Sequence, residues 1–456
     1  MEPTTAVTVD ETDFDRGILA GSGVTFSLPT ALTMGPDGRL YVAELNGRIL
    51  ALTLDPATKA ITAVETVATA ADLQEVFGIA FDPTDTSSPP PVYVVNTVSG
   101  FGGPAPAGSY PGKITKIHGP GYATKTDIIT GLPVSNSVHQ ANGIAFAADG
   151  TLYIAHGSTT NAGVVASTGT QFIRPEVPLS GAILIASPSA GGFDGAITYD
   201  PPGTYSSSVD QVSGDVSVFA SGLRNPYDLV LHSNGRIYAT DNAPNAESGG
   251  ASTSCTTEDP DPWAPDTRGP DELNLIEAGG YYGHPNRNRG RFDARQCVYH
   301  NGLDGSGVDW TGPIDLLPVS TNGLVEYTSA AFGGELAGDL FYVSFNDGLL
   351  GRVVLSPDGT SVVSNATFAS SFITPLDIAV GTDGTLYIAE IFGNQITFMQ
   401  PKPVPVGGVS LEGGLRALSG DSGGSLWLTG WLLAAALAGT VALCSTAWAA
   451  VRRTQG

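Results

Sequence analysis

The 456-residue sequence predicts an all-β fold, a six-bladed β-propeller followed by a single C-terminal transmembrane helix. Three observations predict it. One hairpin phrase recurs along the chain, its 59 glycines and 32 prolines are far more than a helical protein uses, and one long stretch near the end is apolar and uncharged. We expect an N-terminal extension over residues 1–19 and the propeller over residues 20–402. Residues 1–16 are acidic without an apolar core, so they do not resemble a signal peptide.

The recurring phrase is a run of alternating apolar residues, an Asp-Gly or Asn-Gly pair, an aliphatic residue, Tyr and further β-formers. Asp-Gly and Asn-Gly favour tight hairpin turns because they tolerate positive φ. Six copies of a unit with three or four strands indicate a six-bladed propeller. A β-sandwich is the alternative, but it would not repeat one phrase six times. Clear copies lie at residues 32–44, 144–156, 229–241 and 378–390, and looser ones at 79–96 and 333–345.

The C-terminal part predicts a membrane anchor. A Pro/Gly/Ser-rich linker over residues 403–425 leads to residues 426–451, an uncharged stretch long enough to cross a bilayer. Arg452 and Arg453 open a short tail at 452–456, and the positive-inside rule places this tail in the cytoplasm. We therefore expect a single-pass membrane protein with an extracellular or periplasmic propeller. In that oxidising compartment Cys255 and Cys297 can form a disulfide, although two free thiols fit the sequence equally.

The net charge limits the kinds of molecule that the protein can bind. With 20 Lys and Arg against 44 Asp and Glu, the net charge is −24. Nucleic acid is excluded as a partner because the chain has no basic stripe to neutralise phosphates. The acidity is compatible with Ca²⁺ and with neutral substrates such as sugars.

Three loop segments carry more polar chemistry than strand packing requires. Residues 138–143 (VHQANG) contain His139, whose imidazole can take a proton near neutral pH or can simply be hydrogen-bonded. Residues 222–226 (GLRNP) contain Arg224 and Asn225, which can donate hydrogen bonds to a ligand carboxylate. The alternative is that Arg224 forms an ordinary salt bridge with one of the many acidic residues. Residues 241–285 combine backbone carbonyls and carboxylates, which suit Ca²⁺ or cap turns and strands.

Taken together, the segments HQANG, GLRNP, DNAPN, DELN and YYGHP resemble the soluble quinoprotein glucose/sorbosone dehydrogenase family over about residues 26–400. The resemblance implies a six-bladed propeller that oxidises a sugar or alcohol hydroxyl by hydride transfer to pyrroloquinoline quinone (PQQ), assisted by Ca²⁺. It implies that His139 is the catalytic base, that Arg224, Asn225 and Gln74 contact PQQ, and that the carbonyls of Ala243 and Pro244 hold the bridging Ca²⁺. Asp271 and Glu272 correspond to an acidic pair near a second calcium.

The sequence also departs from that family. Its PQQ-binding members carry further cations in the last two blades. Here the segment that leads into blade five is interpreted as residues 330–335 (AAFGGE), and that of blade six as residues 372–375 (FITP), neither with Lys or Arg. Because PQQ has three carboxylates, we expect weaker cofactor binding.

Three functions therefore compete. The first is a cell-surface, PQQ-dependent sugar or alcohol dehydrogenase with an unidentified electron acceptor, favoured by His139, Arg224 and Asn225. The second is a non-catalytic carbohydrate- or protein-binding propeller that has lost PQQ, favoured by the missing cations. The third is a metal-dependent lactonase, which would need Glu, Asn and Asp around one ion.

Overall fold

The computed structural model describes residues 9–403 apart from 99–108, 137, 162–164, 166–170, 207, 246–268 and 285–310. These residues belong to one compact unit, Met1–Val404. Several predicted features lie outside the described residues: the linker beyond residue 403, the transmembrane helix, the cytoplasmic tail, Cys255 and Cys297. Within the described part, no helix is long and apolar enough to span a bilayer.

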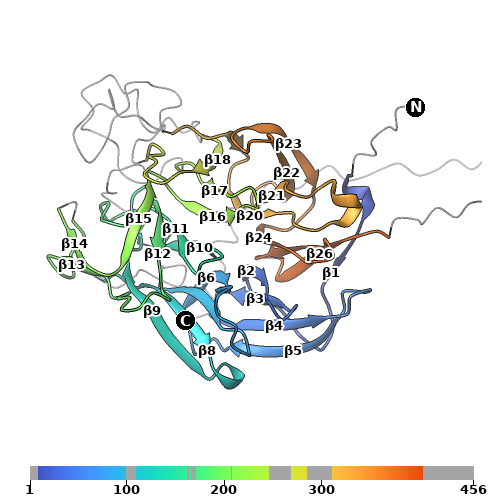
Figure 1. The fold of residues 1–456 in the computed structure, drawn as a ribbon, viewed down its shortest axis with the longest axis horizontal. Coiled ribbons are helices and arrows are strands. Elements are labelled where there is room, and N and C mark those ends of the chain that lie inside the picture. Colours follow the sequence, from blue (N-terminus) through green and yellow to red (C-terminus); the bar gives the residue numbers. More distant parts are fainter. Residues whose placement is uncertain are drawn as a thin grey trace, which may run out of the picture. The chain divides into compact units, whose positions relative to one another are not determined.

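Six four-stranded antiparallel sheets make up the described core, and they confirm the predicted six-bladed propeller (Figure 1). The first strands of successive blades contact one another in a closed ring around the centre. From the innermost strand outward, the blades are β2 (Pro29–Met34), β3 (Leu40–Glu44), β4 (Ile49–Leu54) and β5 (Ile61–Ala68); β6 (Glu75–Ala80), β7 (Val92–Thr97), β8 (Gly112–His118) and β9 (Thr124–Leu132); β10 (Ala141–Phe146), β11 (Leu152–His156), β12 (Ala182–Ala186) and β15 (Val216–Ser221); β16 (Pro226–Leu231), β17 (Ile237–Asp241), β18 (Asp271–Ile276) and β19 (Asp315–Leu317); β20 (Thr321–Glu326), β21 (Leu340–Ser344), β22 (Leu349–Leu355) and β23 (Val362–Ala369); and β24 (Pro375–Val380), β25 (Leu386–Glu390), β26 (Gln395–Pro401) and β1 (Phe14–Ile18).

Short additional elements decorate this core. A two-stranded hairpin, β13 (Thr198–Asp200) and β14 (Asp210–Ser213), is inserted between the third and fourth strands of blade three. The 3₁₀ turns are η1 (Glu11–Asp13), η2 (Pro120–Tyr122) and η4 (Ala331–Gly334).

The ring is closed by the N-terminal strand. β1 pairs antiparallel with β26 from Phe14 opposite Pro401 to Ile18 opposite Thr397, so blade six contains strands from both ends of the propeller. Residues 14–18 therefore belong to the propeller rather than to the N-terminal extension predicted over residues 1–19. This pairing has no local signal in the sequence because the partner strand lies almost four hundred residues away.

The repeated phrase forms the turn between the first and second strands of four blades. Its glycines, Gly38, Gly150, Gly235 and Gly384, have φ between 79° and 84°, a conformation that residues with a side chain rarely adopt. The preceding Asp or Asn stabilises the turn by accepting a hydrogen bond from the backbone two residues later, as Asp149 does from the Thr151 amide at 2.9 Å. The hairpin prediction is thus confirmed at the level of individual turns.

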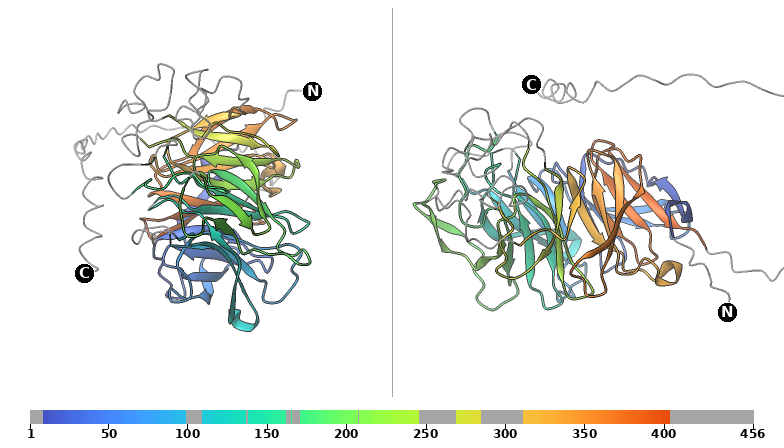
Figure 2. Two further views of the ribbon diagram at one scale, coloured as in Figure 1. Left: turned by 90° about the vertical axis from the view of Figure 1, so that its left-hand side faces the viewer. Right: turned by 90° about the horizontal axis from the view of Figure 1, so that it is seen from above.

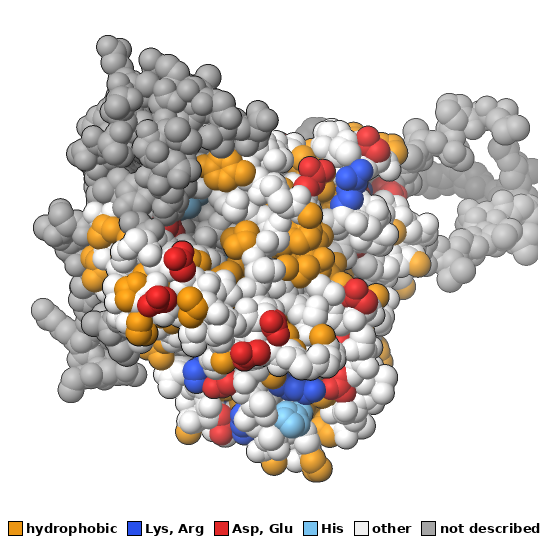
Figure 3. Space-filling view, turned by 60° about the vertical axis from the view of Figure 1, so that its left-hand side comes forward, with side chains coloured by type: hydrophobic (Ala, Val, Ile, Leu, Met, Phe, Trp, Pro, Cys, Tyr) orange, Lys and Arg blue, Asp and Glu red, His pale blue; other side chains and the backbone are white. Residues whose placement is uncertain are grey.

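Six apolar clusters hold the blades together, one between each adjacent pair. Alternate residues of a strand pack against opposite neighbours: in β3, Tyr41 faces blade two and Leu40 faces blade six, and both are fully buried. This two-sided burial explains why the second strands are largely apolar up to their last residues, and the side views in Figure 2 show the blades packed face to face. Acidic side chains are scattered over the face in Figure 3, where Lys and Arg are few.

Candidate active site

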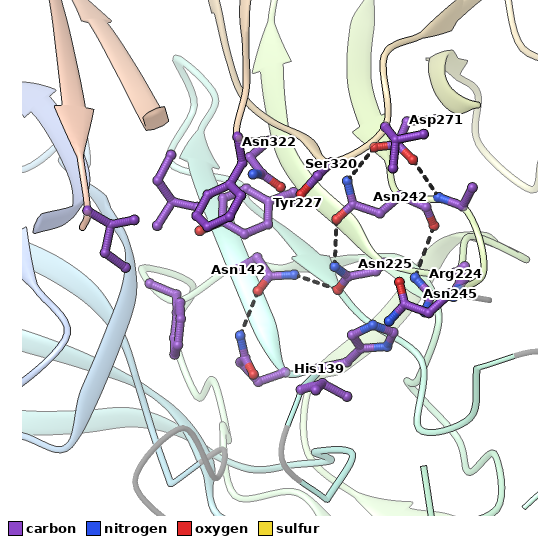
Figure 4. A pocket seen from close by; sticks show the side chains of 18 of the residues that line it. His139, Asn142, Arg224, Asn225, Tyr227, Asn242, Asn245, Asp271, Ser320 and Asn322 are labelled. Atoms are coloured by element: carbon purple, nitrogen blue, oxygen red, sulfur yellow. Dashed lines mark hydrogen bonds between the residues drawn. The ribbon is translucent and has the colours of Figure 1, made fainter. Parts of the chain in front are cut away.

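A cavity of about 260 Å³ lies at the end of the central channel where the inner strands begin (Figure 4). It has two dissimilar walls. The polar wall comes from blades three and four and comprises His139, Gln140, Asn142, Arg224, Asn225, Asn242, Asn245 and Asp271. The mainly apolar wall comes from blades one, two, five and six and comprises Leu45, Phe77, Val319, Phe345, Leu376, Ile391 and Phe392, together with two polar residues of blade five, Ser320 and Asn322.

His139 is placed by a tight turn immediately before β10. The Ser135 amide donates to the His139 carbonyl at 2.7 Å, and the His139 amide donates to Ser135 Oγ at 2.6 Å. The ring Nδ1 lies 3.0 Å from the Ser158 carbonyl, an acceptor, so Nδ1 carries the proton. Nε2 is then the lone-pair nitrogen, and it makes no hydrogen bond to a described residue. His139 is thus held in the tautomer that a general base requires.

The surroundings of His139 favour its neutral form. The ring is 3 % exposed and meets Phe172 edge-on, with centroids 4.9 Å apart. Burial, followed by the nearby positive charge of Arg224, holds the pKa of His139 well below its ordinary value. The imidazole can therefore accept a proton across the neutral pH range.

Arg224 is 1 % exposed and is held on several sides. Its Nε donates to the Asn161 carbonyl at 3.0 Å, and one terminal nitrogen donates to Asn161 Oδ1 at 2.5 Å. The other terminal nitrogen donates to the Asn242 carbonyl at 3.3 Å. The backbone amides of Arg224 and Asn225 both donate to the Asp241 carboxylate, which fixes the start of β16.

A chain of side-chain amides crosses the polar wall from blade three to blade five. Asn142 donates to Asn225 Oδ1 at 3.0 Å, and Asn225 donates to Asn242 Oδ1 at 2.9 Å. Asn242 donates in turn to Asp271 Oδ2 at 2.9 Å, and Asp271 also accepts the Thr321 amide at 2.7 Å. Each residue fixes the orientation of the next, so the wall is preorganised.

The structure therefore brings together His139, Arg224, Asn225, Ala243 and Asp271, five of the predicted site residues, in the lining of one cavity. Pro244 is buried beside them in the same segment. The Ala243 amide donates to Asp271 Oδ1 at 2.8 Å, so Asp271 holds this segment in place.

Two of the predicted site residues, Glu272 and Gln74, do not line this cavity. Asp271 and Glu272 are adjacent in β18, and neighbouring side chains of a strand point to opposite faces. Asp271 lines the cavity, whereas Glu272 is fully buried and accepts from Asn274 at 3.4 Å, so only Asp271 of the two belongs to this cavity. Gln74 is exposed before β6 and does not line the cavity; Phe77 takes that place.

The predicted lead of blade five is wrong. Residues 330–335 lie in and around η4, which joins β20 to β21 at the opposite end of β20 from the cavity. The segment that enters blade five is residues 318–320, of which Val319 and Ser320 line the cavity. It too lacks a cation, and Arg224 is the one Lys or Arg among the described residues of the lining.

Four residues in or around the site were not predicted from the sequence: Phe172, Tyr227, Asn161 and Glu176. Tyr227 follows Pro226 in β16, where an irregularity in the register turns its side chain towards the channel. Such irregularities occur near the start of every inner strand, and only the pairing of neighbouring strands reveals them.

A profile of the glucose/sorbosone dehydrogenase family matches residues 26–395, most of the propeller. The chain belongs to this family. It is 24 % identical over 303 residues to quinoprotein glucose dehydrogenase B of Acinetobacter calcoaceticus, and the match covers 63 % of this chain and 55 % of that relative. The chain thus spans little more than half of the relative's length.

Solved structures support the same fold. PQQ-bound aldose sugar dehydrogenase of Streptomyces coelicolor superimposes with a TM-score of 0.54 at 17 % identity, covering 85 % of this chain and 98 % of that one. The calcium structure of a carbohydrate-active enzyme of family AA12 from Trichoderma reesei gives 0.56 at 15 % identity, covering 86 % and 97 %. Membership of the family confirms the resemblance seen in the sequence.

The chemistry of the polar wall is compatible with an anionic quinone such as PQQ. Arg224 and Asn225 bring N–H groups to the cavity lining, and the Ser158 carbonyl leaves Nε2 of His139 as an acceptor. Both amide hydrogens of Asn142 and of Asn242 instead donate to other groups of the protein and hold the wall together. The segment of Asn242, Ala243 and Asn245 adds the hard oxygen atoms that suit Ca²⁺. The described residues hold no cluster of three or more His, Cys, Asp or Glu, so a calcium site here would depend on carbonyl and amide oxygens.

Proposed function

We propose that this family member oxidises a hydroxyl group of a sugar or alcohol, with PQQ as the hydride acceptor and His139 as the general base. The observation that carries the proposal is the state of His139: buried, neutral, with Nδ1 hydrogen-bonded to a fixed carbonyl and Nε2 available at the cavity. A positioned base of this kind contributes about 10²–10⁴ to a rate.

The residues of the polar wall would divide the work. His139 Nε2 would take the proton of the substrate hydroxyl group while the carbon that bears this hydroxyl loses its hydrogen as a hydride. The substrate would thereby become a carbonyl compound or a lactone. Arg224 and Asn225 would orient the cofactor, and the carbonyls of Ala243 and Pro244 would hold Ca²⁺. PQQ supplies the two-electron acceptor, polarised by Ca²⁺, when both are bound. An external electron acceptor completes the turnover.

The two other functions rest on different features. The apolar wall and the single lining cation favour a binding propeller that has lost PQQ. A lactonase is not favoured, because Asp271 is the one carboxylate among the described lining residues and already accepts three hydrogen bonds from neighbouring groups.

Location is part of the proposal. The uncharged stretch at residues 426–451, followed by Arg452 and Arg453, supports a membrane anchor with the propeller on the outer side. Protease treatment of intact cells tests this: the propeller should be degraded if it is displayed outside, and protected if the topology is reversed.

The enzymatic proposal is tested with the purified full-length protein. We expect reduction of an artificial dye in the presence of PQQ, Ca²⁺ and at least one member of a panel of aldoses and alcohols. Fluorescence titration of PQQ separates loss of binding from loss of catalysis. Saturable PQQ binding without dye reduction by any substrate would contradict the dehydrogenase, and absence of both would support the binding propeller.

A further inference from the structure

A buried carboxylate that does not line the cavity lies behind the polar wall. Glu176 is 3 % exposed and belongs to the loop that precedes β12. Its Oε1 accepts from the Thr160 amide at 2.9 Å, from the Thr160 hydroxyl and from His284 Nε2 at 3.0 Å. Its Oε2 accepts from the Thr159 amide at 3.1 Å, the Thr159 hydroxyl at 3.0 Å and Ser180 Oγ at 2.6 Å.

These six hydrogen bonds mean that Glu176 is used as an anion. Burial opposes its ionisation, but the hydrogen bond and charge of His284 and the hydroxyls of Ser180 and Thr160 outweigh burial and hold the pKa of Glu176 well below its ordinary value. A buried carboxylate with every oxygen satisfied is a rigid anchor, whereas the same site without its charge would leave several donors unpaired.

The anchored segment, residues 158–161, serves both functional side chains of the polar wall. Its first residue, Ser158, presents the carbonyl that accepts from Nδ1 of His139 at 3.0 Å. Its last residue, Asn161, presents the carbonyl and side-chain oxygens that hold the guanidinium of Arg224. The two residues between them, Thr159 and Thr160, are those that Glu176 binds through both backbone and hydroxyl groups.

We propose that Glu176, supported by His284, is a positioning residue that fixes residues 158–161 and thereby sets both the tautomer of His139 and the orientation of Arg224. Glu176 does not contact the cavity, so it acts through this segment. The inference rests on the proposed function for its kinetic consequence, but its structural consequence, the tautomer of His139, can be measured without cofactor or turnover.

The decisive variant is Glu176→Gln, which keeps the size of the side chain but replaces an acceptor oxygen with an NH₂ group that faces hydrogen-bond donors. We expect kcat to fall about 10- to 100-fold, as for other residues that orient a functional side chain through hydrogen bonds, with little change in KM. Burial and then the charge of Arg224 lower the pKa of His139, and His284 lowers it further. The hydrogen bond to Ser158 and the charge of Glu176 raise this pKa, but by less in total. Because Glu176→Gln removes the charge and weakens the Ser158 hydrogen bond, the pKa of His139 should fall further, and the acid limb of the kcat profile should move to lower pH.

The chain offers a matched control in Glu326. This carboxylate is also buried, accepts from the Ser233 amide at 2.8 Å and from the Ser233 hydroxyl, and lies 3.7 Å from His232 Nε2. It ends β20, whereas the cavity lies at the start of that strand. Glu326→Gln should lower the free energy of unfolding but leave the pH profile and the kcat per folded molecule unchanged.

A direct readout is ¹⁵N NMR of the cofactor-free protein labelled at histidine, with His139→Ala to assign the signal. We expect His139 to be protonated at Nδ1 in the wild type, and a mixture of both tautomers in Glu176→Gln. His284→Phe, which removes one of the six donors, should give a smaller change in the same direction.

The proposal is overturned if Glu176→Gln keeps the wild-type tautomer and pH profile, or if it loses activity only in proportion to unfolded protein, as Glu326→Gln would. If instead the tautomer shifts but no variant or wild type reduces the dye, the positioning role stands and the proposed dehydrogenase fails.

Discussion

The two walls of the cavity differ in almost every physical respect. A continuous hydrogen-bonded network runs along the polar wall of blades three and four from Arg224 through Asn242 to Asp271, and Glu176 supports it from behind through residues 159–161. The apolar wall of blades one, two, five and six has Phe345 and Phe392 packed edge-on, with centroids 5.8 Å apart, and Phe392 is 53 % exposed.

Under the proposed function, the polar wall would serve catalysis and the mainly apolar wall would affect how tightly the cofactor binds. A preorganised network holds a base and an arginine at fixed positions, which is what proton abstraction needs. The mainly apolar wall offers the hydroxyl of Ser320 and the amide of Asn322 but no cation, so Arg224 is the one charged partner for an anionic cofactor among the described lining residues. Changes on the polar wall should therefore affect kcat, and changes on the apolar wall should affect binding.

The largest effect is expected for His139→Ala. Without the base, kcat should fall about 10²- to 10⁴-fold while PQQ still binds, and dye reduction with parallel fluorescence titration measures both. His118→Ala is the control, because His118 lies in β8 and bonds only to Thr126 among the described residues. Equal loss in both variants would remove His139 from the mechanism.

Arg224 provides a test through pH. Because burial and then Arg224 depress the pKa of His139, the acid limb of kcat/KM in the wild type should lie below pH about 6.5, the usual value for histidine. Arg224→Gln removes the charge and should move the limb to higher pH, with kcat reduced about tenfold or more by disorder of the network. Arg224→Lys keeps a charge and should leave the limb closer to the wild type; a limb that ignores both changes would contradict the assignment.

A cation on the apolar wall should improve cofactor binding. Val319→Lys places an ammonium group at the entry to blade five, where the wall is apolar. A hydrogen bond to a charged group contributes about 1.5–3 kcal/mol, so the Kd for PQQ should fall about tenfold or more, as measured by fluorescence titration. Val319→Met, similar in length but uncharged, should leave Kd unchanged, and an equal gain from Met would show that charge is not the missing element.

The smallest effect is expected at the rim. Phe392→Ser should change the free energy of unfolding by less than about 1 kcal/mol, because about half of the side chain is already in water. If the apolar wall contacts substrate, KM should rise about fivefold for a phenyl glycoside and hardly at all for the free aldose. Urea unfolding and steady-state kinetics check the two parts, and an equal rise for both substrates would show that the wall does not distinguish them.

The sequence determined the propeller and most of the polar wall. Period-two alternation and Asp-Gly or Asn-Gly turns are local signals, and in every blade the first two strands are joined by a local connection, so Gly38 or Gly150 can be placed without knowing any other blade. His139, Arg224 and Asn225 stand directly before inner strands, and in a propeller those positions converge on one end of the channel.

Only the tertiary structure decided what depends on distant partners. The pairing of β1 with β26, the opposite faces of Asp271 and Glu272, and the exposure of Gln74 follow from register and from packing between blades. The tautomer of His139 depends on a carbonyl nineteen residues away, which Glu176 and His284 hold in place from two further segments. Hydrogen bonds between segments far apart in sequence leave no periodic pattern, so this part of the site could not be predicted from the sequence and is seen only in the tertiary structure.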